Sequence, residues 1–142
     1  FDVNRYVGKW YEIARLDHRF ERGLKQISAD YSLRSDGGID VVNSGVNIES
    51  GKRESVKGKA YFISRPDVGS LKVSFFGPFY GGYHLINLDK TGYRHVMIAG
   101  SNKDYLWILA REPKLDAAIL QSLINQARQL GFNTGRLIYP EQ

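Results

Sequence analysis

The feature that most constrains the fold is a series of short runs between Trp10 and Arg111 in which apolar and polar residues alternate. Gly, Asp, Asn and Pro residues separate the runs, and no stretch with helical periodicity interrupts them. Alternation with a period of two predicts half-buried β-strands joined by tight turns. Residues 35–38, Ser-Asp-Gly-Gly, predict one such hairpin turn.

Turn signals divide this region into eight predicted strands. The middle strands have one polar face, whereas the last three carry large apolar residues on both faces, so both faces of these three must be covered. Eight antiparallel strands can close into a barrel that holds one small ligand, and closure removes exposed sheet edges. The predicted strands span residues 9–17, 26–34, 39–47, 54–63, 70–76, 82–88, 93–100 and 105–111.

The element that would cover the last strands follows them in the sequence. Asp116 is placed to cap the first turn of a helix, and Gly131 is placed to end it. Residues 136–139 then predict a short final strand. We therefore predict a single all-β domain over residues 1–142, with one amphipathic helix packed outside the barrel. The helical spacing is carried by Leu120, Leu123, Ile124, Ala127 and Leu130.

Composition limits the functions open to such a barrel. The chain contains no Cys, which excludes disulfides, thiolate nucleophiles and cysteine metal sites. Its longest uncharged apolar runs are far shorter than the roughly 20 residues that a membrane-spanning helix needs. The net charge of +5 favours anionic partners in general, but it does not choose among nucleic acid, lipid headgroups and fatty carboxylates.

Three short segments resemble the sequence motifs of the lipocalin family. Gly8-x-Trp10 is similar to the first motif, and Arg111-x-Pro113 is similar to the third. Residues 89–93, Asp-Lys-Thr-Gly-Tyr, resemble the second motif, although the usual Thr before the Asp is absent and one extra residue precedes the Tyr. The three matches occur in the family's order with strand-length spacing. The resemblance implies an eight-stranded antiparallel up-and-down barrel.

Two further segments, residues 17–23 and 75–83, resemble the bacterial lipocalins, a subgroup similar to plant temperature-induced lipocalins and apolipoprotein D. That resemblance implies an outer-membrane lipoprotein that faces the periplasm and is anchored through an acylated Cys upstream of the barrel. The chain opens on Phe1 without a Met or an apolar leader, so we expect a trimmed product whose targeting and anchor segment lies outside this sequence. A homodimer is a further possibility.

Strict up-and-down connectivity places the three motif segments together at one end of the barrel. A guanidinium over an indole is stabilising by about 0.5–2 kcal/mol, so Arg111 over Trp10 would close this base. We predict structural rather than ligand-binding roles for Gly8, Trp10, Asp89, Tyr93, Arg111 and Pro113.

The same connectivity places loops 17–25, 47–53, 77–82 and 100–104 around the open end. These loops carry aromatic residues with no obvious core to fill, Phe20, Phe79 and Tyr80, which contact either a ligand or one another. Strand parity orients Trp107 inward and places Leu106 and Ile108 beneath the helix. The residues predicted to offer hydrogen bonds near the mouth are Tyr31, Asn43, Asn47, Tyr80 and Tyr83. The predicted ligand-binding residues are Tyr31, Asn43, Val56, Ala60, Phe62, Val73, Phe75, Phe79, Tyr80, Tyr83, Leu85, Met97 and Trp107.

An elongated apolar pocket with basic rim residues suits a fatty acid or a phospholipid, especially a lysophospholipid, which is also what the bacterial resemblance implies. Burial of each methylene contributes about 0.8 kcal/mol, so chain length would dominate affinity. Two alternatives remain open: another small hydrophobic ligand, or a barrel filled by its own side chains that acts through its rim loops as a protein-interaction module. The basic rim residues are Arg19, Arg22, Lys52 and Arg53.

The sequence offers no support for catalysis. It contains no G-x-S-x-G, H-E-x-x-H, Walker or dinucleotide-binding motif, and His18, His84 and His95 are scattered. The few enzymatic lipocalins use a nucleophilic Cys that this chain lacks. We expect no enzyme activity, no cofactor and no metal. A nucleic-acid partner is not expected either, because the aromatic residues share faces with Leu, Val and Ala rather than with Lys and Arg.

Glu12 is the residue that fits this apolar interior least well. Strict alternation from an inward Trp10 points its carboxylate into the barrel. There it would pair with an inward Arg or Lys, bind a ligand amine, or avoid the interior through a β-bulge.

Overall fold

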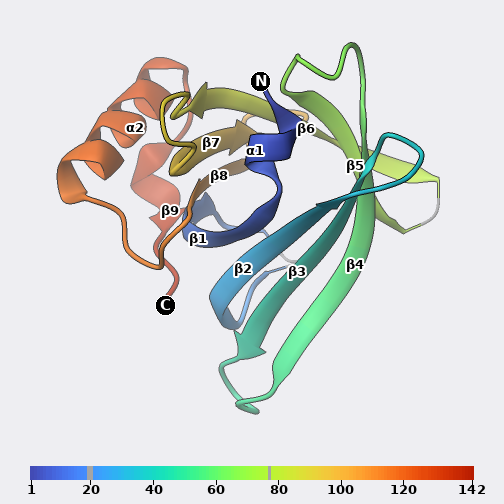
Figure 1. Ribbon diagram of the computed structural model, residues 1–142. Helices are drawn as coiled ribbons and strands as arrows, with labels where there is room; N and C mark the ends of the chain where they lie inside the picture. The colour runs from blue at the N-terminus through green and yellow to red at the C-terminus, as the bar shows by residue number, and fades with distance from the viewer. Residues whose placement is uncertain (19–20, 77) are drawn as a thin grey trace.

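Consecutive antiparallel strands close into a barrel because β1 pairs with β2 on one side and with β8 on the other (Figure 1). The computed structural model describes residues 1–18, 21–76 and 78–142. In this part of the chain the barrel has the eight strands that the alternation predicts, and a short ninth strand pairs with the end of β1. The strands are β1 Gly8–Leu16, β2 Leu24–Leu33, β3 Ile39–Asn47, β4 Arg53–Phe62, β5 Ser70–Phe76, β6 Phe79–Leu88, β7 His95–Ala99, β8 Leu106–Ala110 and β9 Leu137–Ile138.

The helix predicted outside the barrel is α2, Ala117–Gln129. Its cap is the predicted one, because the Asp116 side chain accepts hydrogen bonds from the backbone N–H groups of Ala118 and Ile119. Gly131 follows with a φ of +95°, a conformation that ends a helix at little cost only in glycine. Figure 1 shows α2 lying against the β7 and β8 side of the barrel.

Two cores result from this arrangement, one inside the barrel and one beneath α2. The outer core joins Leu106, Ile108 and Ala110 of β8 to Leu123 and Ala127 of α2. The inner core fills the closed end of the barrel. The prediction that the last strands are covered on both faces is confirmed.

A short helix, α1 (Val3–Tyr6), closes the base and was not predicted. Four residues are too few to show helical periodicity. The Asp2 side chain caps α1 by accepting a hydrogen bond from the Asn4 N–H, and the backbone N–H of Asp2 donates to the Tyr93 hydroxyl at 2.9 Å. Helix α1 lies at the opposite end of the barrel from the β3–β4 turn (Figure 1).

Arg111 ties the base together. Its guanidinium carbon lies 3.9 Å from the centroid of the Trp10 ring, which is fully buried. The guanidinium also donates to several carbonyls at 2.7–3.2 Å, so it joins the end of β8 to α1, to the start of β1 and to the β6–β7 turn. The accepting carbonyls belong to Arg5, Tyr6, Val7, Lys9 and Tyr93.

The other motif residues support this contact. Gly8 has a φ of +108°, and a Cβ there would lie 3.2 Å from Nη1 of Arg111, so both backbone conformation and space favour glycine. The Asp89 carboxylate accepts hydrogen bonds from the backbone N–H groups of Gly92 and Arg94 and fixes the turn that carries Tyr93. These residues lie at the base, as predicted.

We expect Arg111→Ala to lower the free energy of unfolding by about 3 kcal/mol, because it removes charge-assisted hydrogen bonds and a cation–π contact together. Arg111→Lys should lose roughly half as much, since an ammonium keeps the charge but not the planar fork of donors. Urea denaturation monitored by fluorescence measures both. Arg65→Ala is the control, because Arg65 is exposed and should contribute less than about 1 kcal/mol. Equal stability of Arg111→Ala and Arg65→Ala would contradict this role.

Candidate ligand-binding site

The barrel contains a cavity that opens toward the end opposite α1. The space open to the centre of a water-sized sphere is about 110 Å³, and the empty volume between the lining atoms is about 770 Å³ when the part open to solvent is included. The lining is mostly apolar and comes from α1, from the β1–β2 loop and from each of the eight barrel strands. It comprises Tyr6, Glu12, Glu21, Ile27, Ser28, Ala29, Tyr31, Ile39, Val41, Asn43, Ala60, Leu71, Val73, Phe75, Tyr83, Ile98, Trp107 and Leu109.

Seven of the predicted ligand-binding residues lie in this lining: Tyr31, Asn43, Ala60, Val73, Phe75, Tyr83 and Trp107. Whether they contact a ligand stays a prediction. The space beside Gly58 of β4 is occupied, because a Cβ there would lie 2.6 Å from the Phe75 ring. The Phe75 side chain therefore fills the space that Gly58 leaves.

The other predicted lining residues lie elsewhere. The inward placement of Met97 is wrong: it pairs with Ile108 and lies in the outer core beneath α2, because β7 turns Val96 and Ile98 inward instead. Phe62 and Leu85 pack against the core at the base.

Near the mouth, Val56 and Tyr80 are 48% and 41% exposed and are not part of the lining. Lys72 lies over the Tyr80 ring at 4.9 Å from its centroid. Phe20 and the side chain of Phe79 lie outside the described residues.

Sequence reasoning missed several lining residues. Ile27, Ala29, Ile39 and Val41 follow the alternation of β2 and β3 and could have been assigned from parity alone. Tyr6 could not have been assigned in this way, since it belongs to α1, which the sequence did not predict.

A chain of three tyrosine hydroxyls forms the polar group at the deep end of the cavity. The Tyr83 hydroxyl donates to that of Tyr31 at 2.9 Å and is also hydrogen-bonded to that of Tyr6. Tyr31 and Tyr83 were predicted near the mouth, but Tyr31 pairs with Gly8 at the start of β1, so these hydroxyls lie toward the base. Burial raises the pKa of all three phenols, to about 12 for Tyr31, so they remain neutral hydrogen-bonding groups.

A β-bulge in β1 explains the orientation of Glu12. Glu12 pairs with Leu109 and Ala14 pairs with Ile108, so Ile13 is an extra residue in this strand. Ile13 and Ala14 both face the outer core, and Glu12 and Arg15 both turn toward the inside. Nη1 of Arg15 donates to Oε2 of Glu12 at 3.0 Å, and both side chains are 3% exposed. Glu12 therefore points inward and pairs with an inward Arg, one of the three arrangements that the sequence allows.

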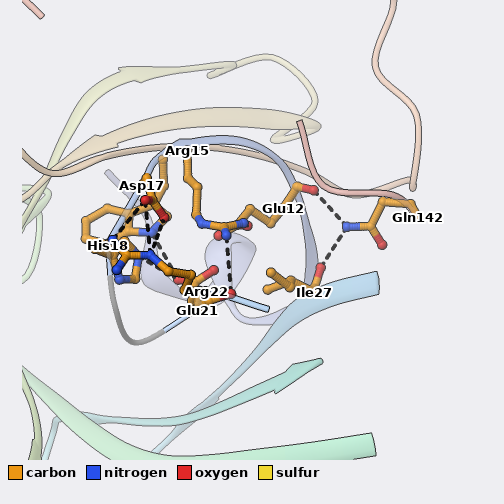
Figure 2. Close-up of polar contacts among 9 residues, drawn as sticks. Glu12, Arg15, Asp17, His18, Glu21, Arg22, Ile27 and Gln142 are labelled. Atoms are coloured by element: carbon orange, nitrogen blue, oxygen red, sulfur yellow. Dashed lines mark hydrogen bonds and ion pairs between the residues drawn. The ribbon is translucent and has the colours of Figure 1, made fainter. Parts of the chain in front are cut away.

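The β1–β2 loop adds a second carboxyl to the same region (Figure 2). Oε1 of Glu21 accepts from the indole Nε1 of Trp107 at 3.2 Å and lies 3.1 Å from Nε2 of His18. The backbone carbonyl of Glu21 accepts from Nη2 of Arg15 at 3.2 Å. The His18 ring also packs edge-on against Trp107, with centroids 5.6 Å apart. These contacts hold the loop against the cavity.

Glu12 and Glu21 titrate as neighbours. Burial, reinforced by the Glu21 carboxylate, raises the pKa of Glu12 well above its usual value. For Glu21, burial is outweighed by hydrogen bonds from Glu12 and His18, and its pKa falls to about 2. One proton is thus retained by the pair while the other carboxyl is ionised.

Outside the cavity, the predicted basic rim residues differ in their surroundings. Arg22 binds Asp17 at 2.8 Å, whereas Lys52 and Arg53 are exposed and Arg19 lies outside the described residues. His84 contacts the Ser70 hydroxyl at 3.0 Å and His95 lies 4.0 Å from Asp89, so these two histidines have partners. Within residues 1–18, 21–76 and 78–142, no cluster of His, Asp or Glu could hold a metal ion, and no helix is long and apolar enough to cross a bilayer.

The raised pKa of Glu12 predicts a pH-dependent stability. Because the folded protein holds this proton more tightly than the unfolded chain, the contribution is complete below about pH 4.5 and is lost as pH rises through the raised value. Relative to Glu12→Gln, the wild-type free energy of unfolding should therefore decrease as the pH rises above about 4.5. Urea denaturation across this range measures the difference. Parallel profiles for the two proteins would contradict the shift.

Tyr83→Phe should lower the free energy of unfolding by about 1–3 kcal/mol, because it removes the hydroxyl that bridges two buried ones. Thermal and urea denaturation measure this loss. Tyr139→Phe is the matched control, since Tyr139 is 54% exposed and its hydroxyl lies outside the core. A change in Tyr83→Phe no larger than in this control would show that the hydroxyl chain contributes nothing to stability.

Comparisons with known proteins agree with the barrel and its motifs. A family model described as a lipocalin-like domain matches residues 1–142. The outer membrane lipoprotein Blc of Vibrio cholerae is 50% identical over 142 residues, which cover 100% of this chain and 83% of that protein. The Blc of Escherichia coli is 51% identical, covering 100% of this chain and 80% of that protein.

Two further comparisons, one of sequence and one of structure, extend these matches. Temperature-induced lipocalin-1 of Arabidopsis thaliana is 32% identical, with 96% of this chain and 76% of that protein covered. The solved structure of insecticyanin from the tobacco hornworm Manduca sexta superimposes with a TM-score of 0.77 at 21% identity, covering 100% of this chain and 81% of that one. Together with the Arg111–Trp10 closure of the base, these matches show that the chain belongs to the lipocalin family.

Proposed function

We propose that this protein binds and carries a single-chain lipid, a fatty acid or a lysophospholipid, with the acyl chain inside the barrel and no catalytic step. The observation that carries the proposal is the cavity, whose walls between the tyrosine hydroxyls and the Glu12–Glu21 pair are apolar. Val41, Val73 and Leu71 line this stretch. A barrel filled entirely by its own side chains would leave no such space, so the cavity favours ligand binding over action through the rim loops alone.

Membership of the lipocalin family supports a binding function, and the relatives support a location. The two Blc proteins that match the whole chain are named outer membrane lipoproteins. We propose that this chain is likewise associated with the bacterial outer membrane, on its periplasmic face, through a lipidated segment upstream of Phe1. There it would store or transport membrane lipids.

Filling the cavity should abolish binding. Val73→Trp places an indole among the lining residues, and we expect it to weaken binding of the neutral probe N-phenyl-1-naphthylamine at least tenfold, as followed by probe fluorescence. Lys72→Trp is the matched control, since Lys72 is the next residue of β5 and its side chain is exposed. In competition with the probe, lengthening an alkyl chain by two methylenes should raise affinity roughly fifteenfold.

The lipids that co-purify with the protein provide the second readout. Extraction with organic solvent followed by mass spectrometry should recover single-chain lipids from the wild type and from Lys72→Trp, and fewer from Val73→Trp. Probe binding that is unaffected by Val73→Trp, or absent from the wild type, would refute ligand carriage in the cavity.

A further inference from the structure

We propose that Glu12 and Glu21 form a subsite for a cationic headgroup, so that the cavity selects a single-chain amphiphile with a primary ammonium over one with a carboxylate. This inference rests on the proposed function, since it names the headgroup chemistry that the same cavity takes. It separates the candidate lipids, because a free fatty acid would bring a third carboxylate to a site that already has two.

The first argument is the balance of charge in the lining. Glu12 and Glu21 both line the cavity, and the described lining contains no Lys, Arg or His side chain. Arg15 approaches from β1, and its two terminal nitrogens donate to Oε2 of Glu12 and to the backbone carbonyl of Glu21, while its buried Nε has no partner among the described residues. One guanidinium thus faces two carboxyls, which leaves room for one further positive charge.

The second argument is an unused acceptor. Oε1 of Glu21 is engaged by His18 and Trp107, whereas Oε2 is buried and, apart from the neighbouring Glu12 carboxyl, has no partner among the described residues. A buried carboxylate oxygen without a donor is costly. A proton shared with Glu12 relieves that cost in the empty cavity, and the ammonium of a bound amphiphile would relieve it in the complex.

Among residues 1–18, 21–76 and 78–142, the other groups facing the pair do not supply the missing cation. The β1–β2 loop contributes His18, which contacts Glu21, and the Asp17–Arg22 pair, which is closed on itself. From β2 and β3 the lining offers Ser28, Asn43 and the Tyr31 hydroxyl, all neutral. The C-terminal Gln142 amide donates to the backbone carbonyls of Glu12 and Ile27 rather than to the carboxylates (Figure 2).

Binding of an ammonium should therefore displace a proton. Burial beside Glu21 raises the pKa of Glu12, so the pair still carries a proton where an isolated glutamate would have lost it. An alkylammonium keeps its own charge at neutral pH, since amine pKa values lie near 10.4. The proton and the ammonium then compete for the same position at the Glu12–Glu21 pair. The affinity for the amine should therefore fall as the pH is lowered. Affinity for a neutral alcohol of equal length should not.

The test compares decylamine, decanol and decanoate as competitors of N-phenyl-1-naphthylamine at neutral pH. We expect decylamine to displace the probe at a concentration roughly tenfold lower than decanol, and decanoate to be weaker than decanol. Glu21→Gln should weaken decylamine roughly tenfold or more relative to decanol and should improve decanoate relative to decanol. Glutamine still offers an oxygen to the Trp107 indole, so the loop contact is retained.

Glu12→Gln should also reduce the preference for decylamine over decanoate. If Glu12→Gln does not fold, the result for Glu21→Gln alone tests the proposal. Glu49→Gln is the matched control, because it removes one exposed carboxylate from the β3–β4 turn without touching the lining. Calorimetry in buffers of different ionisation enthalpy should detect proton release with decylamine and none with decanol.

Equal displacement by all three amphiphiles, or tighter binding of decanoate, would overturn the headgroup proposal while leaving lipid carriage intact. The headgroup proposal also fails if Glu21→Gln keeps the wild-type selectivity, as Glu49→Gln is expected to do. Failure of the neutral probe and of decanol to bind at all would instead refute the carrier function on which this inference rests.

Discussion

The hydrogen bond from Arg15 to Glu12 is the interaction on which the chemistry of the cavity depends. It exists because β1 carries one extra residue at Ile13, so that two charged side chains three positions apart turn inward while Ile13 and Ala14 join the outer core. A buried guanidinium needs acceptors, and Arg15 finds one of them in the backbone of Glu21. The bulge thereby also brings the β1–β2 loop against the barrel.

The two ends of the barrel are built on different principles. At the base, Arg111 donates to backbone carbonyls of three segments and covers Trp10, and three neutral tyrosine hydroxyls lie above this closed end. Toward the mouth, Glu12, Arg15, His18 and Glu21 form a polar cluster whose protons can redistribute. An apolar wall between this closed end and a titratable upper cluster suits a ligand with one long apolar chain and one charged end.

Much of the fold was predictable because alternation, turns and helix caps are local signals. The strands, the Asp116 cap and the closing role of Arg111 followed from the sequence. Helix α1 was missed because four residues carry no period, and Met97 was placed inward because register in β7 depends on a bulge in its neighbour β6. Strict inward and outward alternation can be followed along a strand only as far as the first β-bulge.

The candidate site was predictable to a smaller extent for the same reason. The inward orientation of Trp107 and Glu12 followed from parity, and the lining confirms both orientations. The inward orientation of Arg15 could not be predicted, since strict alternation points this residue outward. Glu21 could not be placed either, because it lies on a loop, where side chains do not alternate between two faces. Tyr31 and Tyr83 were correctly predicted to face the barrel interior, but they were placed at the mouth instead of the base. The height of each residue in the barrel depends on the register between neighbouring strands, which parity does not give.

A crystal structure of the protein with decylamine bound would test the central claim most directly. The account predicts the alkyl chain between Val41 and Val73 and the nitrogen within hydrogen-bond distance, about 3 Å, of a Glu12 or Glu21 carboxylate oxygen. A chain bound outside the barrel, or one inside it with the nitrogen turned away from both carboxylates, would contradict it.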